Sequence, residues 1–243
     1  MNTRLSDSFE QIATIKGGEF MAPPEMHLSD ALRREGKYEE ARACIADELK
    51  TLDESDLCGR LTCALELAKV ERSAGNLAAS LRILDEAAAL ADLCPSHERR
   101  ARYRHGRAHS FQLLGETDKA LIEYGGAAFE WERADRPYDA GCTENNLALI
   151  LGGAGRHDEA HEHVARARAY FAGMPVELAQ VDDTEAQIFL AEGKPEAALP
   201  LAMRAVDVFR SHDEPEMFRR ALPTLIKAAV DCQVTFSIPP VAE

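Results

Sequence analysis

The sequence predicts an all-α protein, a right-handed solenoid of stacked antiparallel helix hairpins. The pattern Gly-x-x-x-x-Ala begins at Gly36, Gly115, Gly155 and Gly193, and Gly75 begins the same pattern with Ser in place of Ala. Neighbouring glycines are 38 to 40 residues apart, which is too regular for chance. Before and after each glycine, apolar residues recur at steps of three and four, the period of a helix.

Each repeat glycine marks the turn of one hairpin. A glycine adopts a positive φ at little cost, and it therefore commonly ends a helix. The polar residues that follow begin the next helix, as Glu116 and Thr117 do after Gly115. Pro195 fits the first turn of its helix, where the missing N–H costs nothing.

Small residues recur at three offsets from the glycines, where they allow helices to approach closely. Seven positions before the glycines stand Ser29, Ala68, Ala108, Ala148 and Ala186; five after stand Ala41, Ser80, Ala120, Ala160 and Ala198; twelve after stand Glu48, Ala87, Ala127, Ala167 and Ala205. Larger apolar residues fill the remaining contact positions: Leu32, Phe111, Leu151 and Phe189 before the glycines, and Ile45, Leu84, Tyr124 and Val164 after them.

This arrangement resembles the tetratricopeptide repeat (TPR) family, from roughly Met26 to Ser211. The family repeat is about 34 residues long, so these units are longer by about five residues. The resemblance implies that the first helix of each hairpin lines a concave groove. It also implies a TPR-like packing of helices throughout the array.

Three segments divide the chain. Residues 1–25 are expected to form an N-terminal arm or cap, in which Leu5, Phe9, Ile12 and Ile15 could lie on one helix face. Residues 26–211 form the five hairpins. Residues 212–243 supply a C-terminal capping helix, which covers the last apolar face of the array, and an extended tail.

Composition and charge exclude several classes of protein. The 243 residues are 46% apolar, as in globular proteins, and their net charge of −14 argues against nucleic acid as the main partner. No run approaches the ~20 apolar residues of a membrane span, and the first ten residues do not resemble a signal peptide. The six cysteines form no Cys-x-x-Cys pair. We expect reduced cysteines in the core of a cytoplasmic protein that binds neither nucleic acid nor membrane.

No motif supports an enzyme or a cofactor site. The strongest candidate is His157-Asp-Glu-Ala-His161-Glu-His163, in which two histidines four residues apart share a helix face. It departs from the zincin pattern because Asp158 stands in place of the glutamate. Ala160 inside the motif is also needed for packing. We interpret this stretch as the charged, solvent-facing start of a helix and expect no metal.

Polar and basic residues are predicted to line the concave groove. The predicted partner-binding residues are Lys69, Arg72, Arg102, His105, His109, Gln112, Asn145, Leu149, Gln180 and Gln187. The same faces carry Thr62, Leu65, Cys142 and Asp183. Arg and Lys form charge-assisted bonds with carboxylates, and Asn and Gln can pair with both groups of an extended backbone.

The sequence therefore favours a non-catalytic adaptor or scaffold that binds a protein or peptide segment in its groove. An acidic segment would suit the basic residues, and a homo-oligomer is compatible with the pattern. Two alternatives stay open. One is a peptide-sensing regulatory protein that acts through protein contacts, resembling bacterial regulators with TPR arrays. The other is a metal-binding protein or enzyme at His157, His161 and His163.

Overall fold

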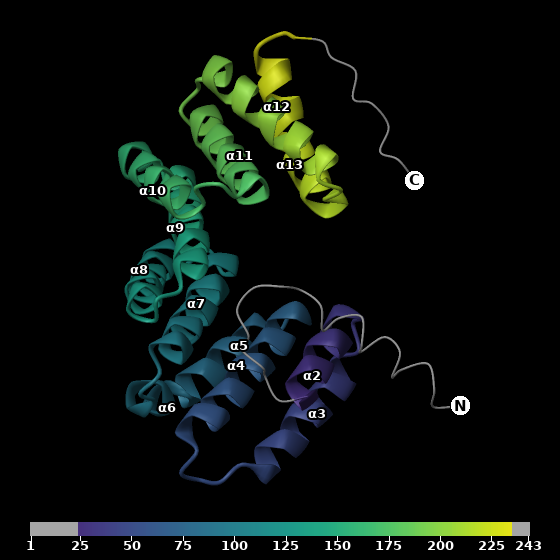
Figure 1. Ribbon diagram of the computed structural model, residues 1–243, viewed down its shortest axis with the longest axis vertical. Coiled ribbons are helices and arrows are strands. Elements are labelled where there is room, and N and C mark those ends of the chain that lie inside the picture. The colour runs from purple at the N-terminus through teal and green to yellow at the C-terminus, as the bar shows by residue number, and fades with distance from the viewer. Residues whose placement is uncertain (1–23, 235–243) are drawn as a thin grey trace, which may run out of the picture.

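The computed structural model describes residues 24–234, and within this range the chain forms helices and turns but no strand (Figure 1). The helices are α2 (Pro24–Arg34), α3 (Tyr38–Thr51), α4 (Leu57–Ser73), α5 (Leu77–Glu86), α6 (Ala88–Leu93), α7 (His97–Leu113), α8 (Thr117–Arg133), α9 (Pro137–Gly153), α10 (His157–Tyr170), α11 (Pro175–Ala191), α12 (Pro195–Ser211) and α13 (Pro215–Asp231). The predicted all-α solenoid of stacked helix hairpins is confirmed. The predicted N-terminal arm, apart from its last two positions, and the extended tail beyond Val234 lie outside the described residues.

Successive helices pair as hairpins, which stack in chain order. α2 packs against α3, α4 against α5, α7 against α8, α9 against α10, and α11 against α12. The last helix, α13, packs against α11 and α12. The stack curves into an open arc, with α8 and α10 on its outer side and α2 and α13 at its two ends (Figure 1). Among the described helices, none combines the length and the apolar character needed to cross a membrane.

The repeat glycines end the first helix of each hairpin, as predicted. All five have a φ between 73° and 82°. At Gly115, the backbone N–H donates to the carbonyl oxygen of Gln112 (3.0 Å), and the N–H of Glu116 donates to that of Phe111 (2.9 Å). The equivalent pair of bonds recurs at the other four glycines. These bonds satisfy carbonyl groups at the helix end, so the turn needs no side-chain partner.

The small residues lie where helices meet. The two sets that stand seven positions before and five positions after the glycines are all at most 1% exposed. Of the third set, Ala127, Ala167 and Ala205 are fully buried, and Glu48 in the first unit is 9% exposed. A larger side chain at such a position would push two helices apart, because the interior of a protein is closely packed.

One disulfide contradicts the expectation that all six cysteines are reduced. Cys58, in the first turn of α4, is bonded to Cys94, which follows α6. The two lie 36 positions apart in sequence and come together only when the second hairpin folds, so their spacing gave no signal. The second helix of this hairpin is also divided: α5 ends at Glu86 and α6 begins at Ala88, which brings α6 against α4.

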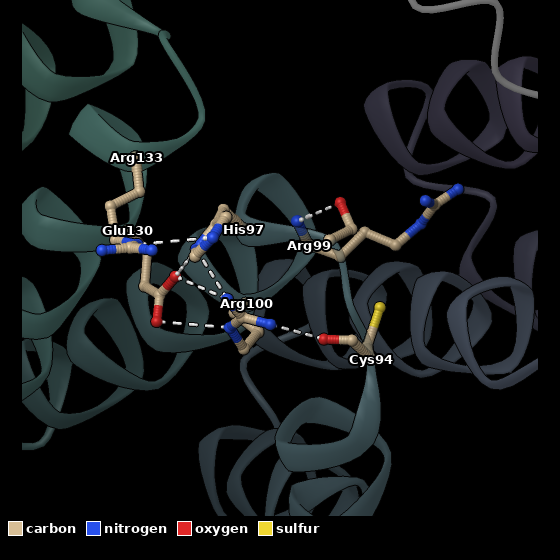
Figure 2. Close-up of polar contacts among 7 residues, drawn as sticks. Cys94, His97, Arg99, Arg100, Glu130 and Arg133 are labelled. Carbon is tan, nitrogen blue, oxygen red and sulfur yellow. Dashed lines mark hydrogen bonds and ion pairs between the residues drawn. The ribbon is translucent and has the colours of Figure 1, made fainter.

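Polar contacts join α7 to α8 within the third hairpin and tie this hairpin to Cys94 (Figure 2). Arg100 donates to the carbonyl oxygen of Cys94 (2.6 Å) and to the carboxylate of Glu130 on α8 (3.2 Å). The Nδ1 atom of His97 lies 2.6 Å from the same carboxylate, and Arg133 donates to its Nε2 atom (3.3 Å). Burial raises the pKa of Glu130, but the hydrogen bonds from His97 and Arg100 outweigh it and hold this pKa below its usual value.

Two buried carboxylates join helices of neighbouring hairpins. Asp182 of α11, 3% exposed, pairs with Arg168 of α10 (2.6 Å) and Arg204 of α12 (2.5 Å). Glu71 of α4, 8% exposed, pairs with Arg42 of α3 (2.6 Å). Removing one partner would leave a charge buried without compensation, which costs far more than an exposed pair contributes.

We expect that replacing both bonded cysteines, Cys58→Ala with Cys94→Ala, lowers the free energy of unfolding by roughly 2–4 kcal/mol, because the open chain gains conformational entropy when unfolded. Urea unfolding of the two proteins measures the difference. Cys232→Ser, outside the bonded pair, is the control. A double variant as stable as the unreduced protein would show that the disulfide does not stabilise the second hairpin.

Candidate functional site

The inner side of the arc carries two cavities that meet at Cys142. The first cavity, of about 420 Å³, is lined by Thr62, Leu65, Glu66, Ala68, Lys69, Arg72, Leu84, Arg102, His105, Gly106, His109, Trp131, Asp139 and Cys142. The second cavity, of about 260 Å³, is lined by Cys142, Asn145, Asn146, Leu149, Phe171, Gln180, Asp183, Thr184, Gln187, Phe209, Met217 and Arg220. Most of these side chains come from the first helices α4, α7, α9 and α11. Together the two cavities form one groove along the first helices.

The predicted groove residues divide between the two cavities. Lys69, Arg72, Arg102, His105 and His109 line the first, and Asn145, Leu149, Gln180 and Gln187 line the second. Gln112 lines neither, because its Oε1 atom accepts a hydrogen bond from the hydroxyl of Tyr124 (2.9 Å). The structure thus assigns Gln112 a contact within its own hairpin.

Arg72 has no carboxylate partner among the described residues. Its guanidinium makes only long contacts, to the carbonyl oxygen of Gly106 (3.5 Å) and the hydroxyl of Ser110 (3.4 Å). Burial disfavours its charged form and lowers its pKa from the usual value of an arginine. An arginine stays charged even so, which leaves a largely desolvated cation at the cavity wall.

The other cation on α4 that lines the first cavity already has partners. Lys69 lies 2.8 Å from Asp30 of α2 and 3.5 Å from Glu66. Burial raises the pKa of Asp30, but the bonds from Lys69 and Arg33 outweigh it and place this pKa well below its usual range. These two carboxylates partly neutralise the charge of Lys69, so this lysine attracts an anionic ligand less strongly.

His105 and His109 lie beside Arg72 as neutral groups. Burial, followed by the charges of His109 and Arg72, lowers the pKa of His105 from 6.5 to about 4. Burial and the charge of Arg72 lower the pKa of His109 to about 4 as well. The ring of His105 meets that of Tyr124 edge-on at 5.1 Å, which fixes its orientation. At neutral pH both imidazoles therefore offer hydrogen-bonding groups without adding charge.

Several polar atoms at the cavities have no hydrogen-bond partner. The indole N–H of Trp131, at the first cavity, is buried and has no acceptor. At the second cavity, Oδ1 of Asn145 is buried and has no donor, whereas the carboxylate of Asp183 accepts from Gln187 (2.8 Å) and from the hydroxyl of Thr224. Burial raises the pKa of Asp183. The first cavity thus offers the donors of Arg72 and Trp131 beside the carboxylates of Glu66 and Asp139, and the second offers the free acceptor of Asn145 beside the guanidinium of Arg220.

Sequence reasoning missed Trp131, Met217 and Arg220. Trp131 belongs to a second helix, α8, and the other two belong to the cap, α13, so counting along the first helices could not place them in the groove. The only sequence signal was that Trp131 is the single tryptophan of the chain.

Of the three histidines considered as a metal site, His161 and His163 pair with separate carboxylates, whereas Nδ1 of His157 is buried without a hydrogen-bond partner. Nε2 of His161 lies 2.7 Å from Glu192, and Nδ1 of His163 lies 2.6 Å from Glu144 of α9. Across residues 24–234 no group of three or more metal-ligating side chains is arranged to hold an ion. The arrangement gives the metal alternative at His157, His161 and His163 no support.

We expect acid to destabilise the protein through His105 and His109. Their pKa is about 4 when folded and 6.5 when unfolded. Between these values the unfolded chain binds more protons, so stability is complete above pH 6.5 and is lost as the pH falls toward 4. Each histidine contributes at most about 1.4 kcal/mol per pH unit. The double variant His105→Gln with His109→Gln should flatten the decline in melting temperature, and His212→Gln, at the exposed end of α12, should not. A decline of equal steepness in all three proteins would contradict the account.

No protein-family model matches the chain, and no curated protein matches it in sequence. Solved structures do match it. A kinesin light chain-type protein of Podosopora anserina with nearly identical TPR-like repeats is 19% identical, covering 77% of this chain and 94% of that chain with a TM-score of 0.63. MamA is 16% identical, covering 76% and 96% with a TM-score of 0.55.

A third match is a Rap protein complexed with Competence and Sporulation Factor. It is 16% identical, and the alignment covers 85% of this chain and 64% of the Rap chain with a TM-score of 0.60. At identities this low, structural similarity establishes the fold alone. The chain has the fold of TPR-like helical-repeat proteins.

Proposed function

We propose that this protein binds an acidic segment of a protein or peptide along its groove, as a non-catalytic adaptor or scaffold. The groove is preformed by packed helices, so binding orders few additional protein groups. Leu65 and Leu149 supply apolar contact, and polar side chains on four first helices are available to the backbone of the ligand.

The observation that carries this proposal is Arg72. A largely desolvated guanidinium without a carboxylate partner is costly, and an anionic ligand group would compensate it. A carboxylate fits the planar, two-pronged geometry of arginine. The neighbouring neutral imidazoles of His105 and His109 and the indole N–H of Trp131 can add further hydrogen bonds, so an aspartate or glutamate side chain suits this cavity.

The second cavity favours a different part of the ligand. Oδ1 of Asn145 lacks a donor, and the carboxylate of Asp183, already bonded by Gln187 and Thr224, has further lone pairs. Backbone N–H groups or a hydroxyl of the ligand would satisfy them. A bound segment would therefore place its acidic residue at α4 and α7, and donor groups at α9 and α11. This arrangement gives the segment one orientation along the groove.

Local charge is compatible with binding an acidic partner to an acidic protein. The net charge of −14 repels such a partner over long distances, but solution ions screen this repulsion beyond about 10 Å at 0.1 M salt. Inside the first cavity, the close charge of Arg72 decides the interaction. We therefore expect the association rate to be low, because long-range repulsion slows the encounter, and the selectivity for an acidic group to be high, because it depends on the contact with Arg72.

A peptide-sensing regulator would bind its peptide in the same groove. It would differ from an adaptor in that the bound peptide changes how the protein contacts a further protein. The similarity to the Rap protein complexed with Competence and Sporulation Factor supports testing this version. Such a role requires that a ligand alter contacts with a further protein. The adaptor role needs only the groove.

We expect random 12-residue peptides selected on the full chain to be enriched in Asp and Glu. For the peptides with an acidic residue, Arg72→Gln should weaken binding about ten- to a hundredfold, because a charged hydrogen bond contributes about 1.5–3 kcal/mol. Calorimetric titration measures the affinity. Arg166→Gln, on the outer helix α10, is the matched control because it removes the same charge outside the groove.

Two results would contradict the proposal. One is that selection enriches no peptide over a blank surface. The other is that Arg72→Gln and Arg166→Gln bind the acidic peptides equally well. Circular dichroism melting of both variants confirms that any loss of affinity does not reflect unfolding.

A further inference from the structure

The outer face of α8 carries an apolar stripe that no other described part of the chain covers. The side chains of Ile122 and Phe129 are 71% and 57% exposed, and they lie seven residues apart on one face of the helix. Burying such large apolar side chains contributes about 1.5–3 kcal/mol each. α8 lies on the outer side of the arc (Figure 1), so this stripe faces away from the groove.

Gly125 lies between these two residues and has no role within its own chain. Its φ is not positive, and a Cβ atom added to it would meet nothing within 4 Å. A glycine inside a helix costs about 1 kcal/mol relative to alanine. Its neighbour Gly126 differs, since a Cβ there would lie 2.8 Å from Arg104. An exposed glycine flanked by exposed apolar residues suits the close approach of another helix.

We propose that α8 is a dimerisation surface that binds α8 of a second copy of this chain. The two helices would cross antiparallel at the midpoint between Gly125 and Gly126. In this arrangement, residues equally distant from the midpoint face one another. Ile122 of each copy then packs against Phe129 of the other, and Gly125 of each copy lets the backbones approach beside the crossing point.

Charge complementarity selects a second copy as the partner. In the same arrangement Lys119 faces Glu132 of the other copy, and Asp118 faces Arg133. Symmetry repeats both pairs, so four ion pairs flank the apolar centre. A parallel pairing would instead place each of these charges against its own equivalent. All four side chains belong to exposed residues.

Contacts within the chain do not prevent these pairs. Lys119 lies 3.1 Å from Glu116, but both side chains are at least half exposed, and such pairs contribute little. Glu132 accepts a hydrogen bond from Tyr170 through Oε1, which leaves its other oxygen available. Arg133 makes one long bond to His97 (3.3 Å) through Nε, and its guanidinium lies over one face of the Phe129 ring, 5.6 Å from the ring centre. The terminal nitrogens of its guanidinium stay available.

The expected dimer is weak and symmetric. One helix from each copy forms a contact at the small end of protein interfaces, below about 1,200 Å². Two chains of net charge −14 also repel each other, so the dimer should be stronger in moderate salt than at very low ionic strength. The groove stays accessible in both copies, and this inference does not depend on its ligand.

Analytical ultracentrifugation of the full chain, from about 1 μM to about 1 mM, covers the range over which a weak dimer dissociates. We expect the native chain to dimerise within this range. Gly125→Leu should raise the dissociation constant at least about tenfold. Its melting temperature should not fall, because a Cβ atom added at Gly125 meets no atom within 4 Å and leucine favours a helix. Ile226→Lys, at an exposed apolar position of α13, is the control and should leave dimerisation unchanged.

Charge reversal tests the antiparallel arrangement. Lys119→Glu alone and Glu132→Lys alone should each weaken the dimer, because each creates two like-charge pairs. An equimolar mixture of these two variants should form heterodimers at least as stable as the native dimer, because every facing pair then has opposite charges. The double variant should also regain dimerisation.

The inference is overturned if the native chain stays monomeric up to about 1 mM, or if Gly125→Leu dimerises like the native chain. It is equally overturned if the mixture of single variants forms no more dimer than either variant alone. Loss of dimerisation in Ile226→Lys, with Gly125→Leu unaffected, would move the contact from α8 to the cap.

Discussion

The structure depends on the close approach of helices at small side chains. In each hairpin, one small residue of the first helix and one of the second are almost completely buried, as Ala108 and Ala120 are in the third hairpin. Because these pairs recur about every forty residues, every hairpin docks on the next in a similar way. The first helices consequently lie side by side on the inner side of the arc. The position of the groove is therefore set by helix packing, and the side chains of the first helices then determine what it can bind.

Ion pairing determines which groove side chains are available to a ligand. Most charges in the described part of the chain are compensated by a neighbour, including the buried Asp182 and Glu71 and the groove residue Lys69. Arg72 differs because its long side chain lies between α4 and α7, where it meets a carbonyl and a hydroxyl but no carboxylate. An acidic protein can in this way contain a cavity that attracts an anion.

The two proposed surfaces lie on opposite sides of the arc. The groove is formed by first helices, and the dimerisation surface lies on the second helix α8. A dimer built through α8 would present two grooves at once, so a partner with two acidic segments would be held by both. The second binding event would then be intramolecular, which raises the overall affinity without a new contact.

The sequence by itself determined the helices, the turns and the small contact positions, because these depend on a local period and on a backbone angle that glycine adopts readily. It also placed Arg72, His105 and Asn145 on one side of the array. Only the tertiary structure decided that Cys58 meets Cys94, that Gln112 accepts a hydrogen bond from Tyr124, and that no carboxylate of residues 24–234 pairs with Arg72. These outcomes depend on pairs of side chains from different helices, often 30 to 40 residues apart. A local periodicity holds no information about which atoms such pairs bring together.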